Sequence, residues 1–168
     1  MSELTGSLQA AISMEQKGYE LYKSAADKTS NKLGKEILEA IAKKELDHIA
    51  AIEKFSSDIG AATKSINPKN KEDYILPIVE NLRGELEDKV KSDSDLAKAY
   101  EVAMGMERES YALYKKLLGE AKDPKAKKFF EFLMGEETTH YELLQETLEY
   151  LNHPGDWFKE QEKWIVEG

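Results

Sequence analysis

The sequence contains no cysteine, which excludes disulfide bonds, thiolate catalysis, iron–sulfur clusters and cysteine-ligated zinc. Its 168 residues include only four prolines and ten glycines, and strong helix formers fill the long stretches between them. No apolar run approaches the ~20 residues that cross a bilayer. The N-terminal segment lacks the basic and apolar regions of a secretory signal. We therefore expect a single cytoplasmic domain over residues 1–168, with no membrane partner.

Positive charge is also scarce, since 24 lysines and arginines face 33 aspartates and glutamates and leave a net charge of −9. Nucleic acids and anionic membranes bind basic surfaces, so neither is an expected partner. The hydrophobic and charged fractions, 40% and 34%, are those of a folded protein rather than a disordered chain.

Apolar residues recur at spacings of three and four, which predicts amphipathic helices. Four long helices are expected, over residues of about 3–28, 33–57, 95–118 and 124–151. Asp123 and Pro124 suit the N-cap and first turn of the last helix. The stretch after residue 57 contains Pro77, and we expect only a short helix within a long connection there. Short, long and short connections predict two antiparallel hairpins, about 3–57 and 95–151, joined by a crossover.

The C-terminal segment predicts a short tail helix over about 156–166, with Asp156 as its N-cap. Its apolar face contains Trp157, Phe158, Trp164 and Ile165. Such a face packs on its own bundle or forms the contact of a homodimer.

The two hairpins are copies of each other at the level of sequence. A shift of 92 positions lays "AISMEQKGYELYK", which begins at Ala11, on "AMGMERESYALYK", which begins at Ala103. The same shift places the Glu45 and His48 pair on the Glu137 and His140 pair without a gap.

Each predicted helix has one glutamate within its apolar stripe. Apolar side chains stand seven and four residues before and seven after Glu15, Glu45, Glu107 and Glu137. These flanking residues are Leu8, Ala11, Tyr22, Leu38, Ile41, Ile52, Tyr100, Ala103, Tyr114, Phe130, Leu133 and Leu144. His48 and His140 lie one turn further along the stripes of the second and fourth helices.

Four carboxylates converging on one core repel one another and lose their solvation, so a compensating charge is required. Two divalent ions would supply four positive charges, and the two histidines would add neutral nitrogen ligands. Carboxylate and imidazole ligands suit iron or manganese, and zinc can also enter such a site. We therefore predict two metal ions, iron first among them, held by Glu15, Glu45, His48, Glu107, Glu137 and His140.

Other polar and aromatic residues near these positions have plainer interpretations. Asp47, Glu136 and Glu142 point off the stripes and are interpreted as surface charge. Tyr19, Tyr22, Tyr111 and Tyr114 are interpreted as core aromatics. His153 lies in a Pro-Gly turn and is expected only to be solvated.

The pattern resembles the rubrerythrin branch of the ferritin-like di-iron carboxylate superfamily. "A-x-x-M-E-x-x-x-Y-x-L-Y" recurs on the first and third helices and "E-x-x-H" on the second and fourth, over roughly Leu8 to Leu151. The resemblance implies an all-α, ferritin-like four-helix bundle with a dinuclear iron site. It also implies that Tyr22 and Tyr114 hydrogen-bond near the irons and orient the ligands.

Two features depart from the family pattern. Rubrerythrins carry a rubredoxin domain with four cysteines, and no such domain is expected here. They also place a further glutamate ligand one turn after the single glutamate of the third helix, where this chain has Ser110. Glu109 is close in sequence but lies about 100° round the helix. Both absences bear on peroxide reductase activity, the best-known chemistry of the family.

The leading functional prediction is a dinuclear iron oxidoreductase that is oxidised by peroxide or dioxygen and re-reduced by an external electron-donor protein. The alternative is a non-catalytic iron-binding or storage protein. A third possibility is a helical interaction module without metal.

Overall fold

The computed structural model describes residues 2–57 and 94–153, and within them it contains four helices and no strand. The helices are α1 (Ser2–Lys28), α2 (Lys32–Ser57), α4 (Ser94–Glu120) and α5 (Pro124–Asn152). The predicted all-α four-helix bundle is therefore confirmed. The short helix expected near Pro77 and the tail helix expected after Asp156 lie outside the described residues.

The ends of the helices follow local capping chemistry. Asp123 is the N-cap of α5, as predicted, and its carboxylate accepts a hydrogen bond of 2.7 Å from the Lys125 backbone N–H. In the turn between α1 and α2, the Asn31 side chain accepts a hydrogen bond of 2.9 Å from the Gly34 backbone N–H. Both turns satisfy N–H groups that a helix start would otherwise leave without partners.

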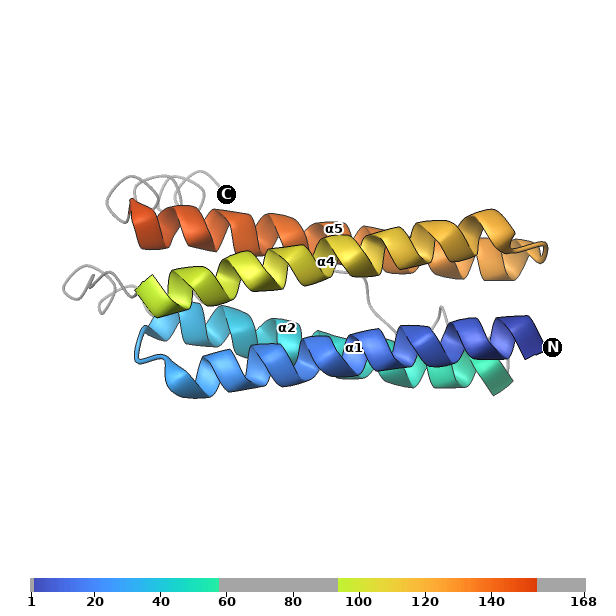
Figure 1. Ribbon diagram of the computed structural model, residues 1–168, viewed down its shortest axis with the longest axis horizontal. Helices are drawn as coiled ribbons and strands as arrows, with labels where there is room; N and C mark the ends of the chain where they lie inside the picture. The colour runs from blue at the N-terminus through green and yellow to red at the C-terminus, as the bar shows by residue number, and fades with distance from the viewer. Residues whose placement is uncertain (1, 58–93, 154–168) are drawn as a thin grey trace, which may run out of the picture.

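The bundle consists of two antiparallel hairpins that lie side by side, α1 with α2 and α4 with α5 (Figure 1). Across the hairpins, α1 packs on α4 and α2 packs on α5. The end of α2 and the start of α4 lie at opposite ends of the bundle (Figure 1). Residues 58–93 therefore join opposite ends, which is the predicted crossover.

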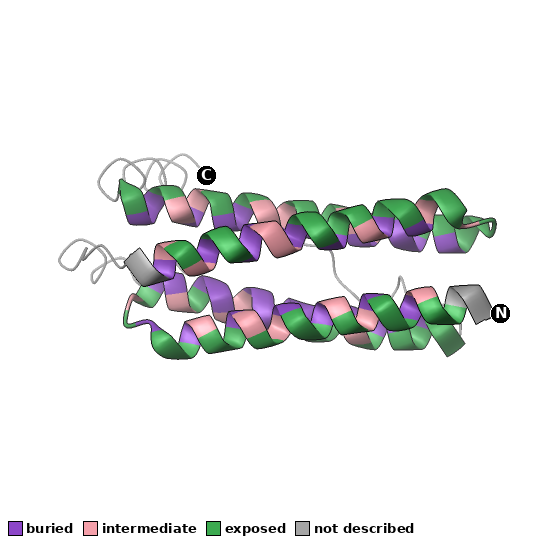
Figure 2. Ribbon diagram, in the orientation of Figure 1, coloured by how far each residue is buried: buried purple, intermediate pink, exposed green. Residues whose placement is uncertain are grey.

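The core runs along the inward faces of all four helices (Figure 2). All twelve apolar residues predicted to flank the four glutamates are buried. They belong to two apolar clusters, one containing Tyr22, Ile41 and Tyr100 and the other containing Phe55 and Phe130. The four glutamates and two histidines are placed between these clusters, because each glutamate has stripe residues on both sides.

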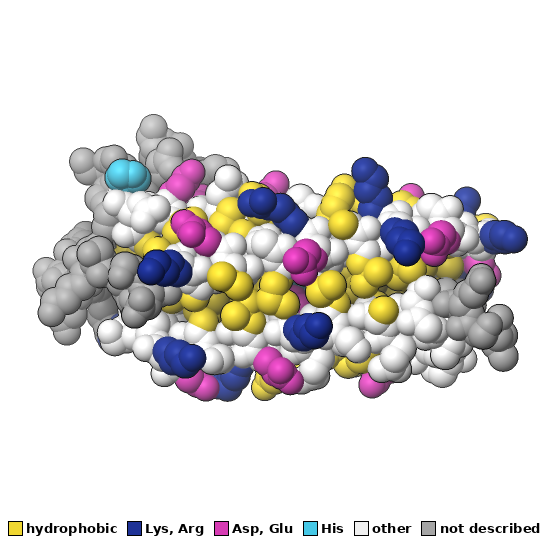
Figure 3. Space-filling model, in the orientation of Figure 1, with side chains coloured by type: hydrophobic (Ala, Val, Ile, Leu, Met, Phe, Trp, Pro, Cys, Tyr) yellow, Lys and Arg dark blue, Asp and Glu magenta, His cyan; other side chains and the backbone are white. Residues whose placement is uncertain are grey.

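The outer surface carries charges of both signs, and on the face seen in Figure 3 hydrophobic side chains gather along the seam between α1 and α4. Among the described helices, none has an apolar stretch long enough to pass through a lipid bilayer.

Candidate metal centre

All six residues predicted from the repeat meet at the middle of the bundle. Each helix contributes one glutamate, and α2 and α5 each add a histidine one turn later. None of the six is more than 2% exposed. The six residues are Glu15 on α1, Glu45 and His48 on α2, Glu107 on α4, and Glu137 and His140 on α5.

The Nδ1 atom of each histidine faces carboxylates from both hairpins. His48 Nδ1 lies 3.2 Å from Glu15 Oε2 and 3.5 Å from Glu137 Oε1. His140 Nδ1 lies 3.6 Å from Glu107 Oε1 and 3.1 Å from Glu45 Oε1. Glu45 and Glu137 therefore lie between the two halves of the site, whereas each remaining glutamate belongs to one half.

Two buried tyrosines tie the halves together. The Tyr22 hydroxyl donates a hydrogen bond to Glu107, and the Tyr114 hydroxyl donates one to Glu15. The 92-residue shift exchanges these two bonds, so the duplicated hairpins form a site with approximate twofold symmetry. Each tyrosine thus contacts a glutamate that belongs to only one half of the site.

Without a metal ion, charge in this cluster is compensated by protons. Burial opposes ionisation of Glu15, but the charge of His48 and hydrogen bonds from its neighbours lower the pKa of Glu15 to about 2. Burial likewise opposes the charged form of His48, but Glu15 and Glu136 raise its pKa to about 9. Glu15 and His48 are therefore an ion pair at neutral pH.

The two central glutamates behave in the opposite way. Burial, together with repulsion from neighbouring carboxylates, raises the pKa of both Glu45 and Glu137 well above the usual range. Both oxygens of Glu137, Oε1 of Glu45 and Oε2 of Glu107 accept no hydrogen bond from any described residue. Buried carboxylate oxygens are normally satisfied, so these atoms fit ligands that await a cation.

The ligand atoms themselves group as a metal site requires. One group joins Glu15, Glu45, His48 and Glu137, a second joins Glu45, Glu107 and His140, and a third joins His48, Glu136 and His140, with the atoms of each group within 4.8 Å of one another. Glu45 belongs to the first two groups. Oxygen and imidazole donors without thiolate suit iron, manganese or zinc.

Ser110 is buried one turn after Glu107, where a further carboxylate ligand would stand in the family pattern, while Glu109 is exposed. The third helix therefore brings a single carboxylate into the cluster.

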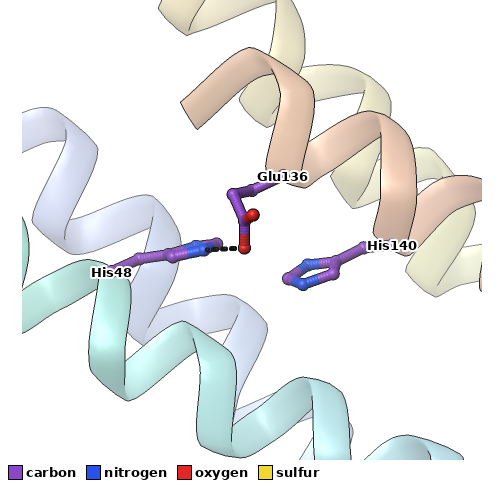
Figure 4. Close-up of side chains that lie close together, drawn as sticks. All are labelled: His48, Glu136 and His140. Carbon is purple, nitrogen blue, oxygen red and sulfur yellow. Dashed lines mark hydrogen bonds and ion pairs between the residues drawn. The ribbon is translucent and has the colours of Figure 1, made fainter. Parts of the chain in front are cut away.

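The interpretation of Glu136 as surface charge is wrong. Its side chain is only 3% exposed, and its Oε2 lies 3.3 Å from His48 Nε2 (Figure 4). The other ring nitrogen of His48, Nδ1, is the one that faces Glu15. The reason is that α5 packs against both α4 and α2, so its buried arc is wider than one stripe. The signal that could have revealed it is Lys44, the oppositely charged residue at the equivalent position of the first repeat. Asp47 and Glu142 are exposed, as predicted.

Tyr111 also departs from prediction, because it is 38% exposed rather than part of the core. It lines a pocket of about 130 Å³ on the α4–α5 face, together with Glu107, Arg108, Glu137, Thr138 and Tyr141. The exposed Arg108 stacks on the Tyr141 ring and donates a hydrogen bond of 3.1 Å to its hydroxyl. Because Glu107 and Glu137 are buried, the pocket connects the surface to one side of the carboxylate cluster.

Comparison with known proteins gives one finding. The family model described as rubrerythrin matches residues 7–148, which contain all six residues of the cluster. Searches of curated proteins and of solved structures found no match.

Proposed function

The chain belongs to the rubrerythrin family, and we propose that it binds two iron ions at this cluster and reduces peroxide or dioxygen with electrons from a separate donor protein. In the peroxide reaction, one molecule of peroxide takes up two electrons and two protons, its O–O bond breaks, and two waters form. The donor then returns two electrons to the site.

The observation that supports this proposal is the set of buried carboxylate oxygens with no hydrogen-bond donor. Four ionised glutamates would place four negative charges in an apolar core, and two divalent ions would balance them. In their absence the central carboxyls hold protons, as the raised pKa values of Glu45 and Glu137 indicate. Metal binding would therefore release protons from the site.

The residues divide into shared and separate ligands. Glu45 and Glu137 lie between the halves and are the ligands that both metals would share. Glu15 with His48, and Glu107 with His140, would each serve one metal. When bound, a pair of ferrous ions supplies the two electrons that an O–O bond needs.

The surrounding residues orient these ligands and admit the oxidant. Tyr22 and Tyr114 fix the carboxylates of Glu107 and Glu15 by hydrogen bonding, which sets the direction of their lone pairs. The pocket beside Glu107 and Glu137 has room for a molecule as small as peroxide or dioxygen.

The test is to load the metal-free protein with Fe(II) without oxygen and then add peroxide. We expect one rapid burst that oxidises two irons per chain, followed by steady peroxide consumption only when a rubredoxin-like donor is supplied. His48→Ala and His140→Ala should each slow the burst.

A single iron per chain, or a burst rate indifferent to both histidines, would contradict the proposal. Accumulation of many irons per chain in a large assembly would instead favour storage. Absence of bound metal in protein purified without chelator and challenged with Fe(II) would favour an interaction module.

A further inference from the structure

Behind the six-residue cluster lies a second layer of buried charge that breaks the twofold symmetry. The 92-residue shift pairs Lys44 with Glu136, and each directly precedes a central glutamate, Glu45 or Glu137. Lys44 is 7% exposed and Glu136 is 3% exposed. Fully buried lysine and glutamate are rare unless they are paired, so both need a reason to be there.

The contacts of Lys44 and Glu136 give a reason for their burial. Glu136 Oε2 lies 3.3 Å from His48 Nε2 and 3.9 Å from Lys44 Nζ. Figure 4 shows the Glu136 carboxylate directed into the space between the rings of His48 and His140. His48 thus presents Nδ1 to the inner carboxylates and Nε2 to Glu136.

This arrangement decides which ring nitrogen carries the proton. An imidazole that binds metal through one nitrogen keeps its proton on the other, and a carboxylate acceptor there fixes the tautomer and strengthens the ligand. Glu136 accepts such a bond from Nε2–H, so once a metal ion replaces the proton on Nδ1, the Nδ1 lone pair of His48 would be directed at the cluster. Lys44 balances the charge of Glu136, so the second layer adds no net charge to the core.

The position related to Glu136 by the repeat cannot accept a hydrogen bond from His140, the histidine of the second half of the site. It holds Lys44, whose ammonium group donates hydrogen bonds and accepts none. The first layer is therefore duplicated, but the carboxylate that supports it comes from one repeat only.

We propose that Glu136, held in place by Lys44, is a positioning residue that fixes the tautomer and direction of His48 and so tightens metal binding in the Glu15–His48 half of the site. This inference rests on the proposed function, because it assigns a role toward a bound metal. Glu136 itself remains outside the set of ligands.

The first experiment measures binding of Zn²⁺, a redox-inert probe, to metal-free protein by competition with a chelator. Glu136→Gln should weaken binding about 10- to 100-fold, as expected for loss of a partner that orients a ligand. Glu142→Gln, an exposed glutamate two residues beyond His140 on the same helix, is the matched control and should bind as the unmodified protein does. Thermal unfolding of the metal-free forms checks that both variants fold.

A nitrogen-15 NMR spectrum of the zinc-loaded protein gives a readout that a purely structural role would not change. The His48 ring should show a protonated Nε2, and Glu136→Gln should shift or broaden that resonance while the control leaves it unchanged.

The charge swap Lys44→Glu with Glu136→Lys makes the inference testable even if one single variant folds poorly. The swap moves the acceptor to the other repeat, so it should recover most of the affinity that Lys44→Glu or Glu136→Lys loses alone. In the spectrum, the Nε2–H resonance shifted by a hydrogen bond to a carboxylate should then be that of His140.

Three outcomes would overturn the inference. Unchanged zinc affinity in Glu136→Gln, with two ions still bound, would reject the positioning role and leave the proposed function intact. If the unmodified protein binds three zinc ions and Glu136→Gln binds two, Glu136 is a ligand of a third ion, together with the two histidines. Failure of the unmodified protein to bind metal would reject the proposed function itself.

Discussion

Gly18 on α1 lies against the side chain of Glu45, and its replacement by alanine tests the position of Glu45. A methyl group on Gly18 would lie 2.9 Å from Glu45 Oε2 and 3.6 Å from Tyr22 Cε2. Ordinary contact begins at 3.4 Å, so the carboxylate oxygen must withdraw by about 0.5 Å. That distance is also the tolerance within which ligands of a functional site must be held.

Two effects of Gly18→Ala then have opposite signs. Alanine in a helix interior is more favourable than glycine by about 0.8–1.0 kcal/mol, which should stabilise the metal-free protein or offset the strain of the new contact. Displacement of Glu45 should weaken metal binding on the order of tenfold, or about 1.4 kcal/mol. Because Glu45 lies between both halves of the site, both metals should be affected.

The assay is thermal unfolding with and without Mn²⁺, since a ligand that binds only the folded state raises the midpoint by an amount that grows with the logarithm of its affinity. Gly18→Ala should keep or raise the midpoint of the metal-free form and reduce the increment that metal adds. Gly105→Ala is the matched control, because nothing lies within 4 Å of its added methyl group. It should raise stability without changing the metal increment. Equal metal increments in both variants would refute the placement of Glu45 as a shared ligand.

Three further predictions concern pH, a central ligand and a helix end. Glu45 and Glu137 have folded pKa values raised well above 4.5, and that of His48 is raised from 6.5 to about 9. All three favour the protonated folded state, so the metal-free protein should lose stability as pH rises from about 5 to 9. Melting curves at the two pH values test this, and greater stability at pH 9 would contradict it. Glu137→Gln should leave the free energy of unfolding of the metal-free protein unchanged at about pH 5 and should raise it at neutral pH, because a glutamate that is protonated only in the folded state costs stability above its ordinary pKa. Metal binding by the same variant, measured by titration, should nevertheless fall sharply, and a large apoprotein loss would make Glu137 a structural group. Asp123→Ala should cost about 1 kcal/mol in chemical denaturation by removing the α5 N-cap, with metal affinity unchanged. A change in metal affinity there would mean that the end of α5 is coupled to the site.

The inner layer of the site could be predicted from sequence because its geometry is periodic. A glutamate on an apolar stripe, with a histidine three residues later, must point into the core once the helix is amphipathic. The 92-residue repeat then brings Glu45 and Glu137 to equivalent positions. Asp123 could be predicted for a similar reason, since capping depends on neighbouring residues only.

Glu136 and Tyr111 could not be placed correctly by the same argument, because both lie at the edges of a stripe. Which edge is covered depends on the neighbouring helix. On α5 the edge that carries Glu136 is closed by α2 and Lys44, whereas on α4 the edge that carries Tyr111 remains partly open at the pocket. Only the packing of the two hairpins decides between these cases.

If the six buried residues form one site for two metal ions, the number of ions bound per chain must be two. Metal-free protein should be titrated with Fe(II) under anaerobic conditions, and bound iron should be counted after removal of the excess. We expect two ions per chain in the unmodified protein and fewer in Glu45→Gln and Glu137→Gln. Binding of one ion or none, or two ions that persist in both variants, would contradict this expectation.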